Sequence, residues 1–140
     1  MIDKKQLIET MKGQHRVLQS DLIEAKNNTT SELFEKVDEY LKKFKIDLKT
    51  HLDLENGTFY PDYFKMSEEK GANIEKIKSF IAEMVEIGEK VTKFLDRYSN
   101  VQSIKSDKAI FTQDLEPIIK TLNLRIEMEE EGIYDIYAAS

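Results

Sequence analysis

Residues 51–60, HLDLENGTFY, and residues 125–134, RIEMEEEGIY, are two versions of one ten-residue motif, 74 positions apart. In both versions a glutamate stands four residues after the first residue, and a tyrosine ends the motif. The first version opens with His51, whereas the second opens with Arg125. Side chains four residues apart on a helix lie on the same face, so each version places a basic side chain next to a carboxylate.

The similarity continues upstream of both motifs. Apolar residues at matching positions precede each motif with helical spacing: Val37, Leu41, Phe44 and Leu48 in one segment, and Phe111, Leu115, Ile118 and Leu122 in the other. We therefore interpret the two segments as a pair of related amphipathic helices. A pseudo-twofold pair of this kind suits a site built in a bundle core from facing helices.

Helix boundaries follow from capping and turn residues. The first helix is expected after Asp3, a favoured N-cap residue, and is expected to end in the run KNNTT at residues 26–30. The second is expected to open at Thr29, with Glu32 three positions later as in a capping box. The third is expected to begin near Ser67, where acidic residues favour a helix N-terminus.

The fourth helix contains Pro117, which either kinks it or marks its first turn, because a proline ring removes a donor and clashes one turn back. Residues 99–108 are expected to connect it to the third helix. Long helices with short connections predict an all-α, antiparallel up-down-up-down four-helix bundle, with residues 1–140 as a single domain.

Composition excludes several classes of protein. The sequence has no cysteine, so thiolate metal sites, disulfides and cysteine nucleophiles are excluded. Its net charge is −6, with acidic and basic residues interspersed, which argues against a nucleic-acid partner. No apolar run has the length of a signal peptide core or a membrane span, so we expect a cytoplasmic protein with no membrane partner. No complete catalytic motif is present, so no enzymatic activity is predicted.

With these motifs the sequence resembles the hemerythrin-like, or HHE cation-binding, family. The first-helix histidine of the family is matched by His15 in QHRVL, the second-helix motif by His51 and Glu55 followed by FYP at residues 59–61, and the fourth-helix carboxylate by Glu129. The resemblance implies an antiparallel four-helix bundle with a non-haem di-iron centre, and it implies that these two histidines and two glutamates are metal ligands.

The sequence departs from the family pattern at one half of that centre. Its third helix has no histidine, and the spacing places Lys70 and Ile74 where family ligands would stand. Arg125 replaces the fourth-helix histidine. In the family, first- and second-helix histidines hold one iron, third- and fourth-helix histidines hold the other, and the carboxylates bridge them. The resemblance therefore implies that the terminal histidine ligands of one iron are lost, whereas the terminal histidine ligands of the other iron are kept.

A buried pair of glutamates is costly unless a cation or hydrogen bonds compensate it. A single metal ion, the guanidinium of Arg125, or both together would supply positive charge, and Lys70 could add a second positive charge. Imidazole and carboxylate ligands suit non-haem iron, manganese or zinc. Tyr60 and Tyr134 are expected to pack at helix ends with their hydroxyls in water.

Three hypotheses follow. The chain is a metal-binding or sensing module that takes one ion and a small diatomic ligand such as O2 or NO. Alternatively, it is a metal-free bundle that serves as a structural or protein-interaction module, with Arg125 in place of metal. The third possibility is an unrelated helical bundle in which the histidine–glutamate pattern is coincidental. The sequence identifies no protein partner.

Overall fold

The computed structural model describes residues 2–72 and 74–139 of the chain. The described residues form helices and their connections, without strands. In chain order the elements are α1 (Lys4–Thr30), α2 (Phe34–Leu54), the π-helical segment η1 (Glu55–Phe59), α3 (Tyr60–Glu69), α4 (Ile74–Arg97), α5 (Val101–Lys105), α6 (Lys108–Met128), the π-helical segment η2 (Glu129–Ile133) and α7 (Tyr134–Ala138).

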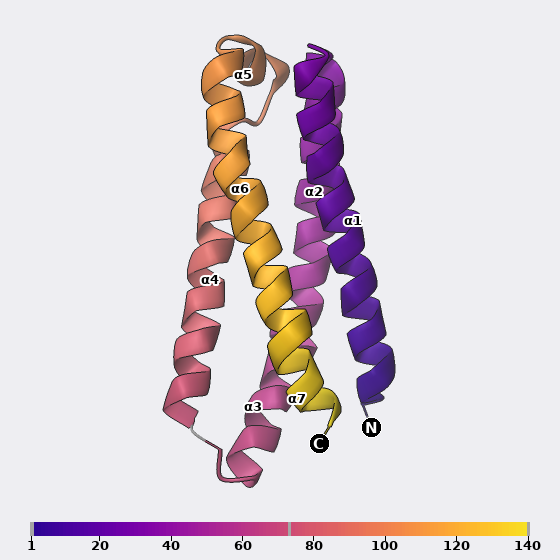
Figure 1. Ribbon diagram of the computed structural model, residues 1–140, viewed down its shortest axis with the longest axis vertical. Helices are drawn as coiled ribbons and strands as arrows, with labels where there is room; N and C mark the ends of the chain where they lie inside the picture. Colours follow the sequence, from indigo (N-terminus) through magenta and orange to yellow (C-terminus); the bar gives the residue numbers. More distant parts are fainter. Residues whose placement is uncertain (1, 73, 140) are drawn as a thin grey trace.

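Four rods run antiparallel along the long axis of the molecule (Figure 1). They are α1, the continuous rod α2–η1–α3, α4, and the continuous rod α6–η2–α7. Both ends of the chain lie at the lower end in this view, as an up-down-up-down order requires. The predicted four-helix bundle is confirmed.

The boundaries of α1 follow local hydrogen bonds. Asp3 is its N-cap, as expected, and its side chain accepts a hydrogen bond from the backbone N–H of Gln6. The expected capping box at Thr29 and Glu32 is wrong, because Thr29 lies in the last turn of α1 and Glu32 follows its C-cap residue, Ser31. The N–H groups of Glu32 and Leu33 close a Schellman motif on the carbonyls of Thr29 and Asn28, with Glu32 at φ 59°.

The second rod passes through Gly57 and Pro61 and continues to Glu69. A Schellman motif ends it, with Gly71 in the left-handed conformation (φ 70°) that glycine adopts without steric cost. The expected start of the third helix near Ser67 is therefore wrong, because Ser67 lies in the last turn of α3. The third rod, α4, begins at Ile74.

The internal repeat extends to the secondary structure. The boundaries of α2 and η1 recur 74 residues later as those of α6 and η2. Pro117 lies inside α6 and not in its first turn. The expected connection over residues 99–108 includes one short helix, α5.

The bundle core has two apolar clusters with a polar layer between them. The upper cluster includes Leu18, Leu48 and Leu122, and the lower one includes Met11, Phe59 and Ile133. The buried charged and polar residues His15, His51, Glu55, Arg125 and Glu129 lie between these positions along the rods. The candidate site is therefore enclosed on both sides by packed apolar side chains.

Candidate metal centre

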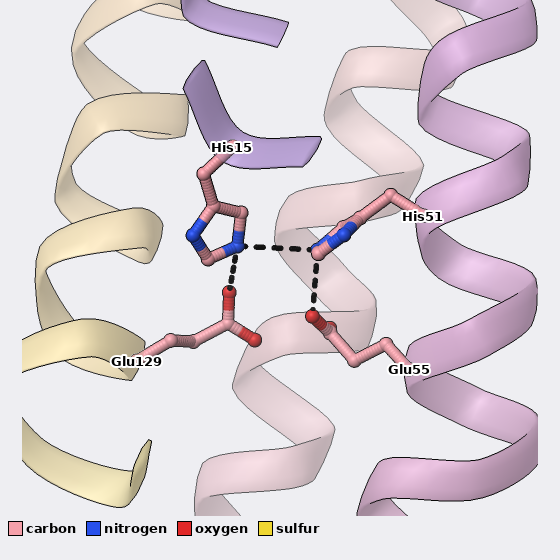
Figure 2. Close-up of side chains that lie close together, drawn as sticks. All are labelled: His15, His51, Glu55 and Glu129. Carbon is pink, nitrogen blue, oxygen red and sulfur yellow. Dashed lines mark hydrogen bonds and ion pairs between the residues drawn. The ribbon is translucent and has the colours of Figure 1, made fainter. Parts of the chain in front are cut away.

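The side chains of His15, His51, Glu55 and Glu129 converge in the middle of the bundle (Figure 2). His15 comes from α1, His51 from α2, and the two glutamates are the first residues of η1 and η2. One ligand atom from each side chain lies within 4.8 Å of the others, and all four residues are buried. The structure thus brings together the four residues that the sequence placed in a metal site.

Both glutamates stand at the start of a π-helical turn. The backbone N–H of Tyr60 donates to the carbonyl of Glu55, and the N–H of Tyr134 donates to that of Glu129, a spacing of five residues. Such wide turns are frequent at functional sites in helices. Their occurrence at both glutamates is a feature of the repeat that the sequence pattern did not predict.

The two tyrosines that follow these turns reach into the site. The Tyr60 hydroxyl donates a 2.7 Å hydrogen bond to Oε2 of Glu129, and the Tyr134 hydroxyl lies 3.4 Å from Nε2 of His15. The expectation that these hydroxyls face water is wrong, because both residues are buried. Burial and the nearby carboxylates raise the pKa of both phenols, so they remain protonated.

Each histidine is oriented by an oxygen acceptor at its Nδ1 atom. Nδ1 of His15 lies 2.6 Å from Oε2 of Glu130, and Nδ1 of His51 lies 2.7 Å from Oε1 of Gln14. An imidazole that donates from Nδ1 presents an unprotonated Nε2 in its neutral form. This arrangement is typical of metal-binding histidines, whose second nitrogen donates to a carboxylate or carbonyl oxygen.

The Nε2 atoms face each other and the glutamates. They are 3.2 Å apart, Nε2 of His51 is 2.8 Å from Oε2 of Glu55, and Nε2 of His15 is 3.3 Å from Oε1 of Glu129. Burial lowers the pKa of His15 despite the opposing effect of Glu130, which favours its neutral form. Four acceptor atoms therefore converge, and the contacts require either an additional proton, on an imidazole or on Glu129, or a cation between them.

Arg125 supplies one positive charge to this group. Its guanidinium forms an ion pair with Oε1 of Glu55, donates a 3.2 Å hydrogen bond to the Met84 carbonyl, and has Nε 3.7 Å from Oε1 of Glu129. Gly88 lies next to it, and a Cβ atom there would be in ordinary van der Waals contact with Nη1 at 3.6 Å. Arg125 thus occupies the side of the site that faces α4.

The two glutamates have different electrostatic surroundings. Burial opposes the ionisation of Glu55, but the adjacent His51 and the charge of Arg125 hold its pKa at about 2. Burial and the charge of Glu55 raise the pKa of Glu129 well above its ordinary value, and Arg125 and Tyr60 only partly offset this. One guanidinium therefore stabilises one carboxylate, and ionised Glu129 requires a further cation.

Lys70 and Ile74 lie elsewhere. Lys70 is exposed at the C-cap of α3, and Ile74 is the first residue of α4. The wall that α4 contributes to the site consists of Ile87, Gly88 and Val91. A third helix that begins near Ser67 would have Lys70 and Ile74 in its first turns, whereas the rod that reaches the site begins only at Ile74.

The donor set fits a single metal ion. Each of the two buried carboxylates has one oxygen without a hydrogen-bond partner among the described residues, Oε2 of Glu55 and Oε1 of Glu129, and these oxygens face the histidines. The cavity at this point measures about 10 Å³, comparable with the smallest space that holds one water molecule.

Gln14 and Glu130 are functional candidates that the sequence did not indicate. Gln14 is adjacent to His15 in the sequence, but its side-chain oxygen pairs with Nδ1 of His51. This pairing depends on how α1 packs against α2. Glu130 stands in a run of three acids that resembles an ordinary solvated surface. Its ion pair with Arg16 and its contact with His15 become evident only in the folded chain.

Comparison with known proteins agrees with this geometry. The sequence model of the family described as Hemerythrin HHE cation binding domain matches residues 6–137. A search of curated proteins and a search of solved structures each found no match. Within the described residues, no helix combines the length and the apolar character needed to cross a membrane.

Proposed function

The chain belongs to the hemerythrin HHE cation-binding domain family, and from this premise we propose that it binds one transition-metal ion in the centre of its bundle. The ligands in this proposal are His15, His51, Glu55 and Glu129. Non-haem iron is the first candidate, in keeping with the family. Manganese and zinc accept the same imidazole and carboxylate donors.

The convergence of Nε2 atoms and carboxylate oxygens carries this proposal. Glu130 and Gln14 accept from the Nδ1 atoms, which leaves both Nε2 atoms directed at each other at 3.2 Å. Acceptor atoms repel at such distances unless a positive species lies between them. A bound metal ion would accept a lone pair from each of the four atoms, and Glu129 would have to be deprotonated to serve as a ligand.

We propose one ion and not two because Arg125 takes the second position. A guanidinium and a metal ion cannot occupy the same space beside Glu55, and α4 presents Ile87, Gly88 and Val91 there. A bound iron would supply coordination positions for a small ligand such as O2 or NO. The chain's own residues bind the ion, hold the imidazoles in one orientation, and place the Tyr134 hydroxyl next to His15.

A metal-free structural or interaction module is the second candidate. The ion pair between Arg125 and Glu55 favours it, because it neutralises one buried carboxylate without metal. A proton on Glu129 would remove the remaining negative charge. In this case the bundle needs no ion for stability.

Metal analysis of protein purified without a His-tag distinguishes the two candidates. After anaerobic exposure to Fe(II), Mn(II) or Zn(II) and gel filtration, we expect about one ion per chain and a higher melting temperature than in the chelator-treated protein. His51→Ala should lose the ion, whereas Asp53→Asn, which removes an exposed charge from the same helix, should retain it. Metal content below about 0.2 per chain, with no effect of chelator on melting, would establish the metal-free module.

A further inference from the structure

A second cavity lies at the lower end of the bundle, away from the candidate metal centre. It measures about 660 Å³, within the range of small-molecule sites, and is formed by α3, α4 and the α6–η2–α7 rod. Apolar side chains line most of it, among them Met66, Phe80, Ile81 and Ile133. Tyr60 forms part of its wall, and the hydroxyl of the same residue binds Glu129.

The first turns of α4 leave apolar surface exposed to this cavity. Ile77, Phe80 and Ile81 are only partly buried, whereas Met84 and Val91 further along the same helix are buried. The three partly buried residues all line the cavity. An apolar ligand would remove this surface from water, which is the main driving force for binding in such pockets.

The charged residues that line the cavity are both lysines. Lys70 and Lys76 line it, and no aspartate or glutamate does so among the described residues. Lys70 is the C-cap residue of α3 and Lys76 lies in the first turn of α4, so these two residues flank the connection between the helices.

We propose that this cavity binds a single-chain amphiphile with an anionic head, of which a fatty-acid carboxylate is the simplest example. The apolar tail packs against Phe80, Ile81 and Ile133, and the head lies at Lys70 and Lys76. The lysines exclude a cationic head by repulsion and distinguish an anionic amphiphile from a neutral one of the same length.

Isothermal titration of the full chain with decanoate, below the concentration at which it forms micelles and in the presence of chelator, tests this proposal. We expect saturable binding of one decanoate per chain and weaker binding of decanol. Lys70→Gln combined with Lys76→Gln should weaken decanoate binding about five- to tenfold and leave decanol binding unchanged. The control Lys65→Gln with Lys90→Gln removes the same charge from exposed positions of α3 and α4 outside the cavity, and it should leave both affinities unchanged.

A cavity-filling variant tests the position of the tail. Gly132→Leu adds a side chain to a residue that lines the cavity, in a place where a Cβ atom meets nothing within 4 Å. Gly57→Leu is the matched control, because Gly57 lies in the other π-helical segment, has the same free space, and lines none of the cavities described. We expect at least a tenfold loss of decanoate binding in the first variant only.

If Gly132→Leu fails to fold, Ile77→Trp fills the same cavity from α4, and circular dichroism checks folding in each case. The proposal is overturned if decanoate does not saturate, if decanol binds as tightly as decanoate, or if cavity-filling variants that fold bind decanoate normally. A dimer that decanoate dissociates, seen by sedimentation velocity, would also overturn it, because the cavity would then receive a second copy of the chain.

Discussion

Arg125 forms an ion pair with Glu55 from the opposite half of the internal repeat. Arg125 and His51 hold equivalent positions in the two halves, since the helices α2 and α6 that carry them are offset by 74 residues. His51 directs an imidazole nitrogen to Glu55 from one side, and Arg125 directs a guanidinium to it from the other. One carboxylate is thus held by a fixed cation, and Glu129 depends on a proton or a metal ion.

Replacing Arg125 tests how far the guanidinium stabilises the fold. Arg125→Met should lower the free energy of unfolding of the metal-free protein by about 3–5 kcal/mol, because it leaves the buried carboxylate of Glu55 without its partner. Urea denaturation in the presence of chelator measures this change. Arg97→Met removes an arginine with a largely exposed ion pair and should cost less than about 1 kcal/mol. Equal costs for the two variants would contradict the role of Arg125.

Neutralising Glu129 should separate metal binding from stability. Burial raises the pKa of Glu129, so metal-free Glu129→Gln should be as stable as the unmodified chain near neutral pH, or more stable. The same variant should bind Fe(II) or Zn(II) at least tenfold more weakly, measured by competition with a chromophoric chelator. Glu127→Gln, an exposed position on α6, provides the matched control. A metal affinity equal to that of the control would remove Glu129 from the ligand set.

The orientation of the histidines should depend on Glu130 and Gln14. Loss of an acceptor at Nδ1 typically lowers metal affinity about 10–100-fold, because the ring rotates and the other tautomer becomes available. We expect this range for Glu130→Gln and for Gln14→Ala in the same competition assay. Glu131→Gln, next in the same run of acids but exposed, should have no effect. If Glu131→Gln weakens binding as much as Glu130→Gln, general charge and not orientation is responsible.

Asp21 lies outside the candidate metal centre and gives the stability a separate pH dependence. Lys43 bridges it to Asp47, with Nζ 3.0 Å from Oδ1 of Asp21 and 2.7 Å from Oδ2 of Asp47. Oδ2 of Asp21 is buried without a hydrogen-bond partner among the described residues. Burial and the neighbouring Asp47 raise the pKa of Asp21 to about 6, although Lys43 opposes this change.

The folded chain therefore holds a proton on Asp21 between about pH 4 and pH 6 that the unfolded chain releases. This contribution to stability is complete below about pH 4 and is lost as the pH rises through about 6. Asp21→Asn should melt at the same temperature as the unmodified chain at pH 4, and about 2–4 °C higher than that chain at pH 7.5. This shift corresponds to a gain of about 1 kcal/mol in the free energy of unfolding, after screening by Lys43 and solvent. Asp53→Asn removes an exposed aspartate with a similar lysine partner and should show no such trend in calorimetry. A constant difference between Asp21→Asn and the unmodified chain from pH 4 to 7.5 would show that Asp21 does not titrate in this window.

The sequence predicted the helices better than their ends. The spacing of apolar residues identified the four rods, and Asp3 identified the start of α1. Thr29 with Glu32, and Ser67 with its following acids, have the composition of helix starts, but both lie in helix ends closed by Schellman motifs. These motifs depend on one residue in the left-handed conformation, which Gly71 suggests in the sequence and Glu32 does not.

Some residues of the candidate site could be predicted from the sequence, and others could not. The repeat and the family resemblance identified His15, His51, Glu55, Glu129 and Arg125, because helical spacing fixes which side chains share a face. They did not identify Glu130, Gln14 or the inward hydroxyls of Tyr60 and Tyr134. These contacts join different rods or follow a π-helical turn, and a pattern within one helix contains neither kind of information.

The sequence by itself determined that this chain forms an antiparallel helical bundle and that its repeated motif keeps two glutamates while only one copy keeps its histidine. The tertiary structure alone decided what surrounds those glutamates. Packing of α1 against α2 and α6 brings the two Nε2 atoms to 3.2 Å, and packing of α4 against α6 places Gly88 next to the guanidinium of Arg125. The reason is physical: helical periodicity is local and is encoded within each segment, whereas the charge balance of a buried site depends on distances between segments that only the folded chain establishes.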